Sequence, residues 1–197
     1  MRLLALGCAL TLATAATAVT ARAQSAQPWS LQASALLTTA NVGSGGSGVA
    51  GGGVEGQLRY TSGLWSLGGG VQYSSHSSRN DATDRDDNIK LTGAFVEPRR
   101  TFVVASPRVG PYLALRGALL RQTNNFGGSS SNGYAFGGGG GVIVALTDRV
   151  NLDGGAAVLR QSLGEFTIGS QEFRFGTLTS YVAKAGVSIG FGSPKPL

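Results

Sequence analysis

The stretch from Val54 to Tyr73 constrains the fold most, because it alternates between two kinds of residue on either side of a short turn. A period of two is typical of a β-strand with two different faces. One face of this predicted hairpin carries Val54, Gly56, Leu58, Tyr60, Trp65, Leu67, Gly69, Val71 and Tyr73. The other carries Glu55, Gln57, Arg59 and then small or polar residues, with the turn at Thr61–Gly63.

The same alternation recurs along the chain and predicts an all-β protein of eight antiparallel strands. They are expected at residues 29–41, 54–60, 64–74, 89–96, 112–122, 134–146, 150–158 and 177–191. Pro98 breaks the pattern, so residues 97–111 are left unassigned, with a bulge or strand end expected there. Long connections near Asn41, Ser75, Gln122 and Gly164 alternate with tight ones at Thr61 and Thr147.

The beginning of the chain has the features of an export signal. Residues 1–23 contain Arg2, an apolar run rich in Leu and Ala, and a small-residue cleavage pattern at Ala21–Ala23. We therefore expect a signal peptide at 1–23, a barrel at 24–191 and a short periplasmic tail at 192–197. Cys8, the single cysteine, would leave with the signal, so no disulfide is expected.

No later window approaches 18 consecutive apolar residues, so an exported chain that spans a membrane must do so as a closed barrel. Short turns at one end and longer connections at the other are typical of an up-and-down outer-membrane barrel with periplasmic termini. The formal net charge of +6 is small and scattered, which disfavours nucleic acid as a partner.

The positions of the charges predict which face meets lipid. On the parity opposite the apolar face lie Glu55, Arg59, Lys90, Arg116, Asp153 and Lys184, two acids and four bases. A lysine or arginine at the lipid midplane costs about 2 to 4 kcal/mol, so these six side chains are expected in the lumen as a charge network. The apolar parity, which includes Ile89, Leu91, Gly93 and Phe95 of the fourth strand, is expected to face lipid. Glu97, Arg121 and Arg160 share that parity but lie near strand ends or Pro98.

A soluble exported barrel with the faces inverted is the alternative fold. Its exterior would be built from small or apolar residues such as Gly68, Gly70, Gly137, Gly139 and Ile143, which is too apolar for a soluble surface.

Aromatic spacing also favours the membrane barrel. By strand rise and tilt, Trp65 and Tyr73 lie roughly 20 Å apart along the axis, and Tyr181 and Phe191 roughly 25 Å. These four are the expected membrane-interface aromatics.

The pattern as a whole, and the closing strand from Tyr181 to Phe191 in particular, resembles the small eight-stranded outer-membrane proteins of the OmpA/OmpX-like class. The resemblance implies a monomer in the outer membrane, in contact with membrane lipid and lipopolysaccharide. It also implies that the barrel-assembly machinery recognises the closing aromatic Phe191, although residues 192–197 extend past it here.

A catalytic site has one faint candidate. His76 and Ser78 resemble the His-x-Ser arrangement of outer-membrane lipid A deacylases, in which a third group must orient the histidine; Asp81 and Asp84 are the nearest acids. A Ser- and Asp-rich surface loop contains such spacings by chance, so no catalytic residue is assigned.

A calcium site formed by Asp81, Asp84, Asp86 and Asp87 lacks the glycine of an EF-hand loop and is interrupted by Arg85. No metal site and no cofactor are predicted.

The predicted function is therefore a structural or surface-interaction role for a non-enzymatic barrel whose lumen is plugged by inward charges. Partners would be met at connections 75–88, 123–133 and 164–176. The alternatives are a lipid A-modifying enzyme, and a small pore or ligand-binding barrel with an open lumen.

Overall fold

The computed structural model describes residues 27–41, 49–80, 85–124, 130–168, 171–174 and 177–193. The predicted signal peptide at 1–23 and residues 194–197 of the predicted tail lie outside this range. The long strands are β1 (Trp29–Asn41), β2 (Val49–Ser62), β3 (Trp65–Asn80), β4 (Arg85–Thr101), β5 (Val109–Asn124), β6 (Ser130–Ala145), β7 (Val150–Leu163) and β10 (Thr177–Phe191). Within these ranges no helix is long and apolar enough to cross a membrane.

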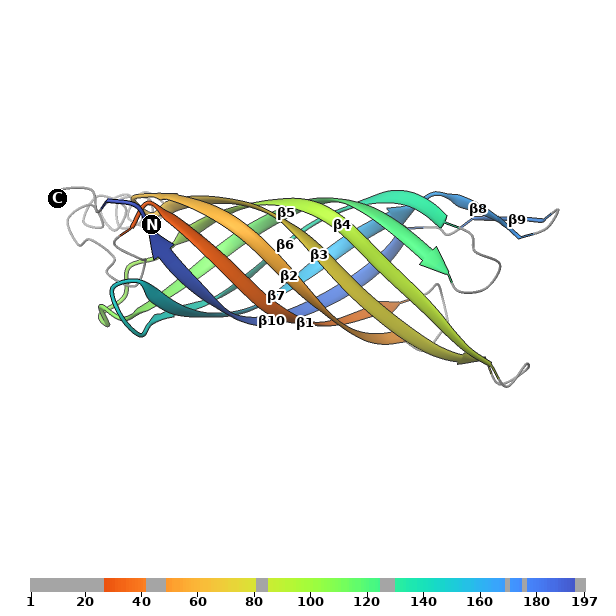
Figure 1. The fold of residues 1–197 in the computed structure, drawn as a ribbon, viewed down its shortest axis with the longest axis horizontal. Helices are drawn as coiled ribbons and strands as arrows, with labels where there is room; N and C mark the ends of the chain where they lie inside the picture. The colour runs from red at the N-terminus through yellow and green to blue at the C-terminus, as the bar shows by residue number, and fades with distance from the viewer. Residues whose placement is uncertain are drawn as a thin grey trace, which may run out of the picture.

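The eight long strands form one closed barrel in the order β1-β10-β7-β6-β5-β4-β3-β2, and each neighbouring pair is antiparallel (Figure 1). The predicted all-β, eight-stranded up-and-down fold is confirmed. Closure gives every strand two partners, so the sheet has no open edge.

The two ends of the barrel differ. β1 begins and β10 ends at one end of the barrel, together with the tight turn between β2 and β3, where Gly63 takes a φ of 58° (Figure 1). At the opposite end, which we call the outer end, a hairpin of β8 (Glu165–Ile168) and β9 (Gln171–Arg174) extends beyond the barrel. Residues 164–176, predicted as the last long connection, do join two barrel strands, but they contain a short hairpin that was not predicted.

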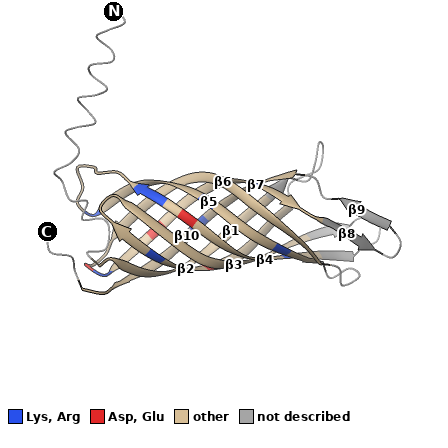
Figure 2. Ribbon diagram, turned by 90° about the horizontal axis from the view of Figure 1, so that it is seen from above, with Lys and Arg blue, Asp and Glu red and all other residues tan. Residues whose placement is uncertain are grey.

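The exterior of the barrel is apolar. Large apolar side chains are strongly exposed around it, for example Leu37 at 71% and Leu119 at 72%. The four predicted interface aromatics, Trp65, Tyr73, Tyr181 and Phe191, are all exposed on this outer surface. Figure 2 shows how few charged residues interrupt the long strands. An apolar belt of this extent on a closed barrel is a lipid-facing surface.

The fourth strand reverses the predicted assignment of its faces. Phe95, Glu97 and Arg99 are buried, whereas Ala94 and Val96 are exposed. Leu91 is also buried. Residues 89–96 therefore turn their larger apolar side chains inward, because a lumen accepts apolar groups at no cost while a lipid-facing surface rejects ionised ones.

Pro98 does not end the strand. It lies opposite Leu67 of β3, and the register between β4 and β5 is the same on both sides of it, from Val96 opposite Gly117 to Arg99 opposite Ala114. The expected bulge or strand end is therefore wrong, and the unassigned segment contains the end of β4 and the start of β5.

The outer part of the lumen contains two apolar clusters, with buried polar side chains such as His76, Gln122 and Gln161 beside them. One buried cluster consists of Phe95, Ala118, Leu120, Ala135, Leu163 and Leu178. A second consists of Leu36, Leu159 and Val182, with Ala157 packed against it. Leu163 is the last residue of β7 and Leu178 the second of β10, the two strands that flank the β8–β9 hairpin, which places the first cluster at the outer end.

Candidate functional site: the charged lumen

Strand alternation delivers seven ionisable side chains to the middle of the lumen. We call them the ion-pair network, and its members are Glu55 and Arg59 of β2, Glu97 and Arg99 of β4, Arg116 of β5, Asp153 of β7 and Lys184 of β10. Each of these side chains is at most 9% exposed. Five of the eight barrel strands thus meet through charge.

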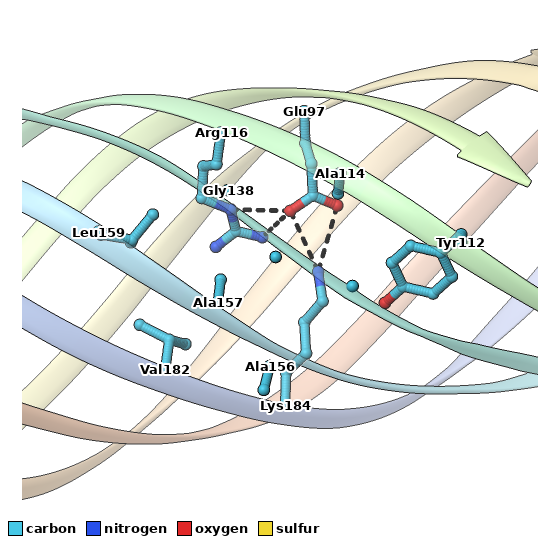
Figure 3. A pocket seen from close by; sticks show the side chains of 12 residues that line it. Glu97, Tyr112, Ala114, Arg116, Gly138, Ala156, Ala157, Leu159, Val182 and Lys184 are labelled. Atoms are coloured by element: carbon cyan, nitrogen blue, oxygen red, sulfur yellow. Dashed lines mark hydrogen bonds and ion pairs between the residues drawn. The ribbon is translucent and has the colours of Figure 1, made fainter. Parts of the chain in front are cut away.

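Glu97 is the centre of the network. Its carboxylate accepts from Arg59 Nη2 at 2.9 Å, from Arg99 Nε at 2.7 Å and from Lys184 Nζ at 3.1 Å. Arg116 also donates to it, through Nε at 2.8 Å. Figure 3 shows Arg116 and Lys184 approaching the Glu97 carboxylate from different strands. One carboxylate that binds four cations cannot be removed without leaving buried positive charge uncompensated.

The other two acids, Glu55 and Asp153, pair with cations that also bind Glu97. Glu55 accepts from Arg116 Nη1 at 2.8 Å and from Lys184 Nζ at 3.4 Å. Asp153 is paired with Arg99 and accepts a hydrogen bond from the Tyr112 hydroxyl at 2.9 Å. Shared cations make the three carboxylates one connected unit.

Two aromatic rings cover the guanidinium groups. Arg99 lies 4.3 Å from the ring centroid of Tyr112, and Arg116 lies 4.0 Å from that of Phe95. Cation–π contacts are worth roughly 0.5 to 2 kcal/mol, the value rising as the pair is desolvated. Phe95 also belongs to the outer apolar cluster, so it joins the charged and the apolar parts of the lumen.

Five of the six side chains predicted for the lumen lie in the network: Glu55, Arg59, Arg116, Asp153 and Lys184. The inward position predicted for Lys90 is wrong. Lys90 stands opposite Ser75 and Thr123, on the outward parity of β4. The error follows from the reversed faces of that strand.

Sequence reasoning missed Glu97, Arg99 and Tyr112, and counted two acids against four bases where the network has three against four. The signal was present, because Glu97 and Arg99 share one parity with each other and with Phe95. Two ionised residues on one face should have outweighed the apolar residues before them.

The space beside the network is small. A cavity of about 20 Å³ is lined by Glu97, Tyr112, Arg116 and Lys184 on one side and by small residues of β6 and β7 on the other. Such a volume holds about one water molecule. The described residues contain no group of three metal-ligating side chains. The site is therefore built for charge pairing across the lumen.

His76, the catalytic candidate, points inward at the outer end of β3. Its side chain is buried, and Nε2 lies 2.6 Å from the Thr38 hydroxyl. No carboxylate of the described residues contacts it. The Ser78 side chain, and Asp81 and Asp84, lie outside the described part of the chain, as do the side chains of Asp86 and Asp87.

Comparisons with known proteins identify the fold. No protein-family model matches the sequence, and no curated protein does either. Neisserial surface protein A (NspA) superposes with a TM-score of 0.64 at 23% identity, covering 83% of this chain and 97% of that one. OprG of Pseudomonas aeruginosa gives 0.51 at 12%, with 87% and 99% covered. Ail, the attachment invasion locus protein of Yersinia pestis, gives 0.50 at 13%, with 82% and 97% covered.

The chain therefore has the fold of the small eight-stranded outer-membrane β-barrels. This fold, together with the apolar exterior, places it in an outer membrane. β1 begins and β10 ends at the end of the barrel that carries the tight β2–β3 turn, and in outer-membrane barrels such short turns usually lie on the periplasmic side.

Proposed function

We propose that the protein is a closed, non-enzymatic, monomeric barrel that anchors surface-exposed connections for interaction outside the cell. The observation that carries the proposal is the ion-pair network, which joins β2, β4, β5, β7 and β10 across the lumen. An eight-stranded barrel has an interior just wide enough for side chains to fill, and here the network and the two apolar clusters occupy it.

The external connections provide the surface role. Residues 75–88, which comprise the outer ends of β3 and β4 and the connection between them, contain four Asp against two Arg, and residues 164–176 contain two Glu against one Arg. Ail of Yersinia pestis has been crystallised with the heparin analogue sucrose octasulfate. Because the connections of this chain are acidic, a sulfated polyanion is disfavoured as its partner and a basic or neutral surface is favoured.

A lipid A-modifying activity is disfavoured by the environment of His76. A base that activates a serine needs an orienting acceptor and access to substrate. His76 instead meets the Thr38 hydroxyl inside the barrel, away from the lipid-facing surface. We expect His76→Ala to leave the lipid A composition of cells unchanged, as measured by mass spectrometry of extracted lipid A. A loss of acylated or deacylated species in this variant would favour the enzyme.

The closed lumen is tested by swelling of liposomes that contain the refolded protein. Wild type is expected to give no swelling in a small neutral sugar such as arabinose, while a general porin at equal molar density serves as the positive control. Swelling at the rate of the porin would show an open pore and would refute the closed lumen.

Protease treatment of intact cells tests the surface role. Cleavage is expected in the external connections and none in the barrel wall.

A further inference from the structure

The lipid-facing surface has a groove in the part of the wall built by β1, β10, β7 and β6. It has a volume of about 340 Å³, within the range of small-molecule sites. Its floor consists of Gly138, Ala156 and Ala183, which face outward on three neighbouring strands. Small side chains on three adjacent strands leave a hollow between the larger side chains of Leu37, Val158 and Tyr181.

The sides of the groove are large and apolar. Leu37 of β1 lies opposite Ala183, and it is 71% exposed. On the other side Leu115 of β5 leans toward Gly138, so that a Cβ added to that glycine would lie 3.2 Å from Leu115 Cδ2. The groove is thus shaped to hold an apolar chain against the barrel, and its position in the lipid-facing belt makes that chain part of the membrane.

A cation stands at the outer end of the groove. Along the outward face of β7, Ala156 and Val158 line the groove and Arg160 follows them. Arg160 is exposed and lies opposite Phe136 of β6 and Thr179 of β10, one row of residues beyond Tyr181. No acidic side chain of the described residues pairs with it. An interfacial arginine above an apolar groove is complementary to a lipid with an anionic headgroup.

We propose that this groove binds one molecule of lipopolysaccharide, with a lipid A phosphate on Arg160 and an acyl chain over Val158, Ala156 and Ala183. The position of Arg160 indicates which lipid binds. Arg160 lies on the side of the external connections, where the outer leaflet of the membrane consists of lipopolysaccharide. The proposal rests on the orientation of the barrel in the outer membrane but not on a closed lumen.

The test is native mass spectrometry of the full-length protein released from detergent, titrated with bisphosphorylated lipid A. Wild type is expected to retain one lipid A. Arg160→Gln should weaken binding about fivefold, the contribution of one interfacial cation. Ala156→Leu should weaken it at least as much by filling the floor. Lipid A without phosphates should bind wild type and Arg160→Gln equally, which separates the headgroup contact from the acyl contact.

Two matched variants control for general effects. Arg121→Gln removes another exposed cation near the outer end of the barrel, on β5, and Ala94→Leu enlarges an exposed alanine on β4, away from the groove. Both should bind lipid A as wild type does. Equal affinity of Arg160→Gln, Arg121→Gln and wild type would overturn the proposal. The proposal would also be overturned if wild type formed a dimer and Ala156→Leu dissociated it, because the groove would then bind a second copy of this chain. A negative result with lipid A would not change the expected absence of liposome swelling. The lipid-binding groove and the closed lumen can therefore be refuted independently.

Discussion

The lumen has two parts that share one wall and are filled by opposite means. The middle part is held by the ion-pair network, in which three carboxylates and four cations meet at distances of about hydrogen-bond length. The outer part contains apolar clusters around Leu120 and Leu159, with buried polar side chains beside them. Only the first part depends on oppositely charged partners being present.

This difference determines how each part responds to substitution. An apolar cluster loses contacts in proportion to the atoms removed and can partly collapse. A buried ion-pair network cannot, because removing one acid leaves cations desolvated without compensation. The middle of the barrel is therefore expected to be the more sensitive part, and Glu97 its most sensitive residue.

The largest expected effect is that of Glu97→Ala. Because four cations share this carboxylate, the free energy of unfolding should fall by about 3 to 5 kcal/mol, as for other broken buried pairs. Urea unfolding in detergent micelles, followed by tryptophan fluorescence, measures the change. Asp148→Ala removes an acid from an exposed turn and should change stability by less than about 0.5 kcal/mol. Equal effects of the two substitutions would contradict a central role for Glu97.

Leu120→Ala tests the apolar part of the lumen. Leu120 is 3% exposed, and its truncation leaves a cavity that should cost about 2 kcal/mol, the lower end of the range for buried leucines, since the nearby outer end can relax. The same unfolding assay applies. Leu120→Met keeps the volume and should cost less than about 1.5 kcal/mol. If Leu120→Ala lowered the free energy of unfolding as much as Glu97→Ala, the two parts of the lumen would not differ in sensitivity.

Phe95→Leu tests the boundary between the parts. The substitution keeps an apolar side chain in the outer cluster but removes the ring that lies 4.0 Å from the Arg116 guanidinium. We expect a loss of about 1 kcal/mol in the free energy of unfolding. An unchanged midpoint of unfolding would mean that the ring contributes packing alone.

Lys90→Ala should have the smallest effect. Lys90 lies on the outward parity of β4, outside the network, and such surface changes are usually within about 0.5 kcal/mol. The readout is again the midpoint of urea unfolding. A loss of several kcal/mol in the free energy of unfolding would indicate that Lys90 lies in the lumen and would overturn the assignment of the β4 faces.

Much of the architecture could be predicted from alternation alone. The outward faces of β1, β2, β3, β5, β6, β7 and β10 follow the expected parity, because each strand carries most of its larger apolar residues on one side and mostly small or polar residues on the other. β4 was the exception, since Leu91 and Phe95 suggested lipid while Glu97 and Arg99 required the lumen. The ionised groups decide, because their cost in lipid exceeds the benefit of exposing two apolar side chains there.

The site was harder to predict than the wall. Alternation assigns a side chain to the lumen but gives no register between strands, so it could not bring Lys184 of β10 against Glu97 of β4, 87 positions apart in sequence. The β8–β9 hairpin was missed for a different reason: its strands of four residues are too short for a period of two to stand out.

The central claim is that β4 turns Glu97 and Arg99 into the lumen, and spin labels on this strand test it most directly. Single cysteines at positions 94, 95, 96, 100 and 101, in a Cys8→Ser background that leaves the ion-pair network intact, would be labelled and their accessibility to oxygen measured in lipid vesicles. Labels at Ala94, Val96 and Arg100 should be accessible to oxygen dissolved in the lipid, and labels at Phe95 and Thr101 should be protected. The opposite alternation would put Glu97 against lipid and contradict the account.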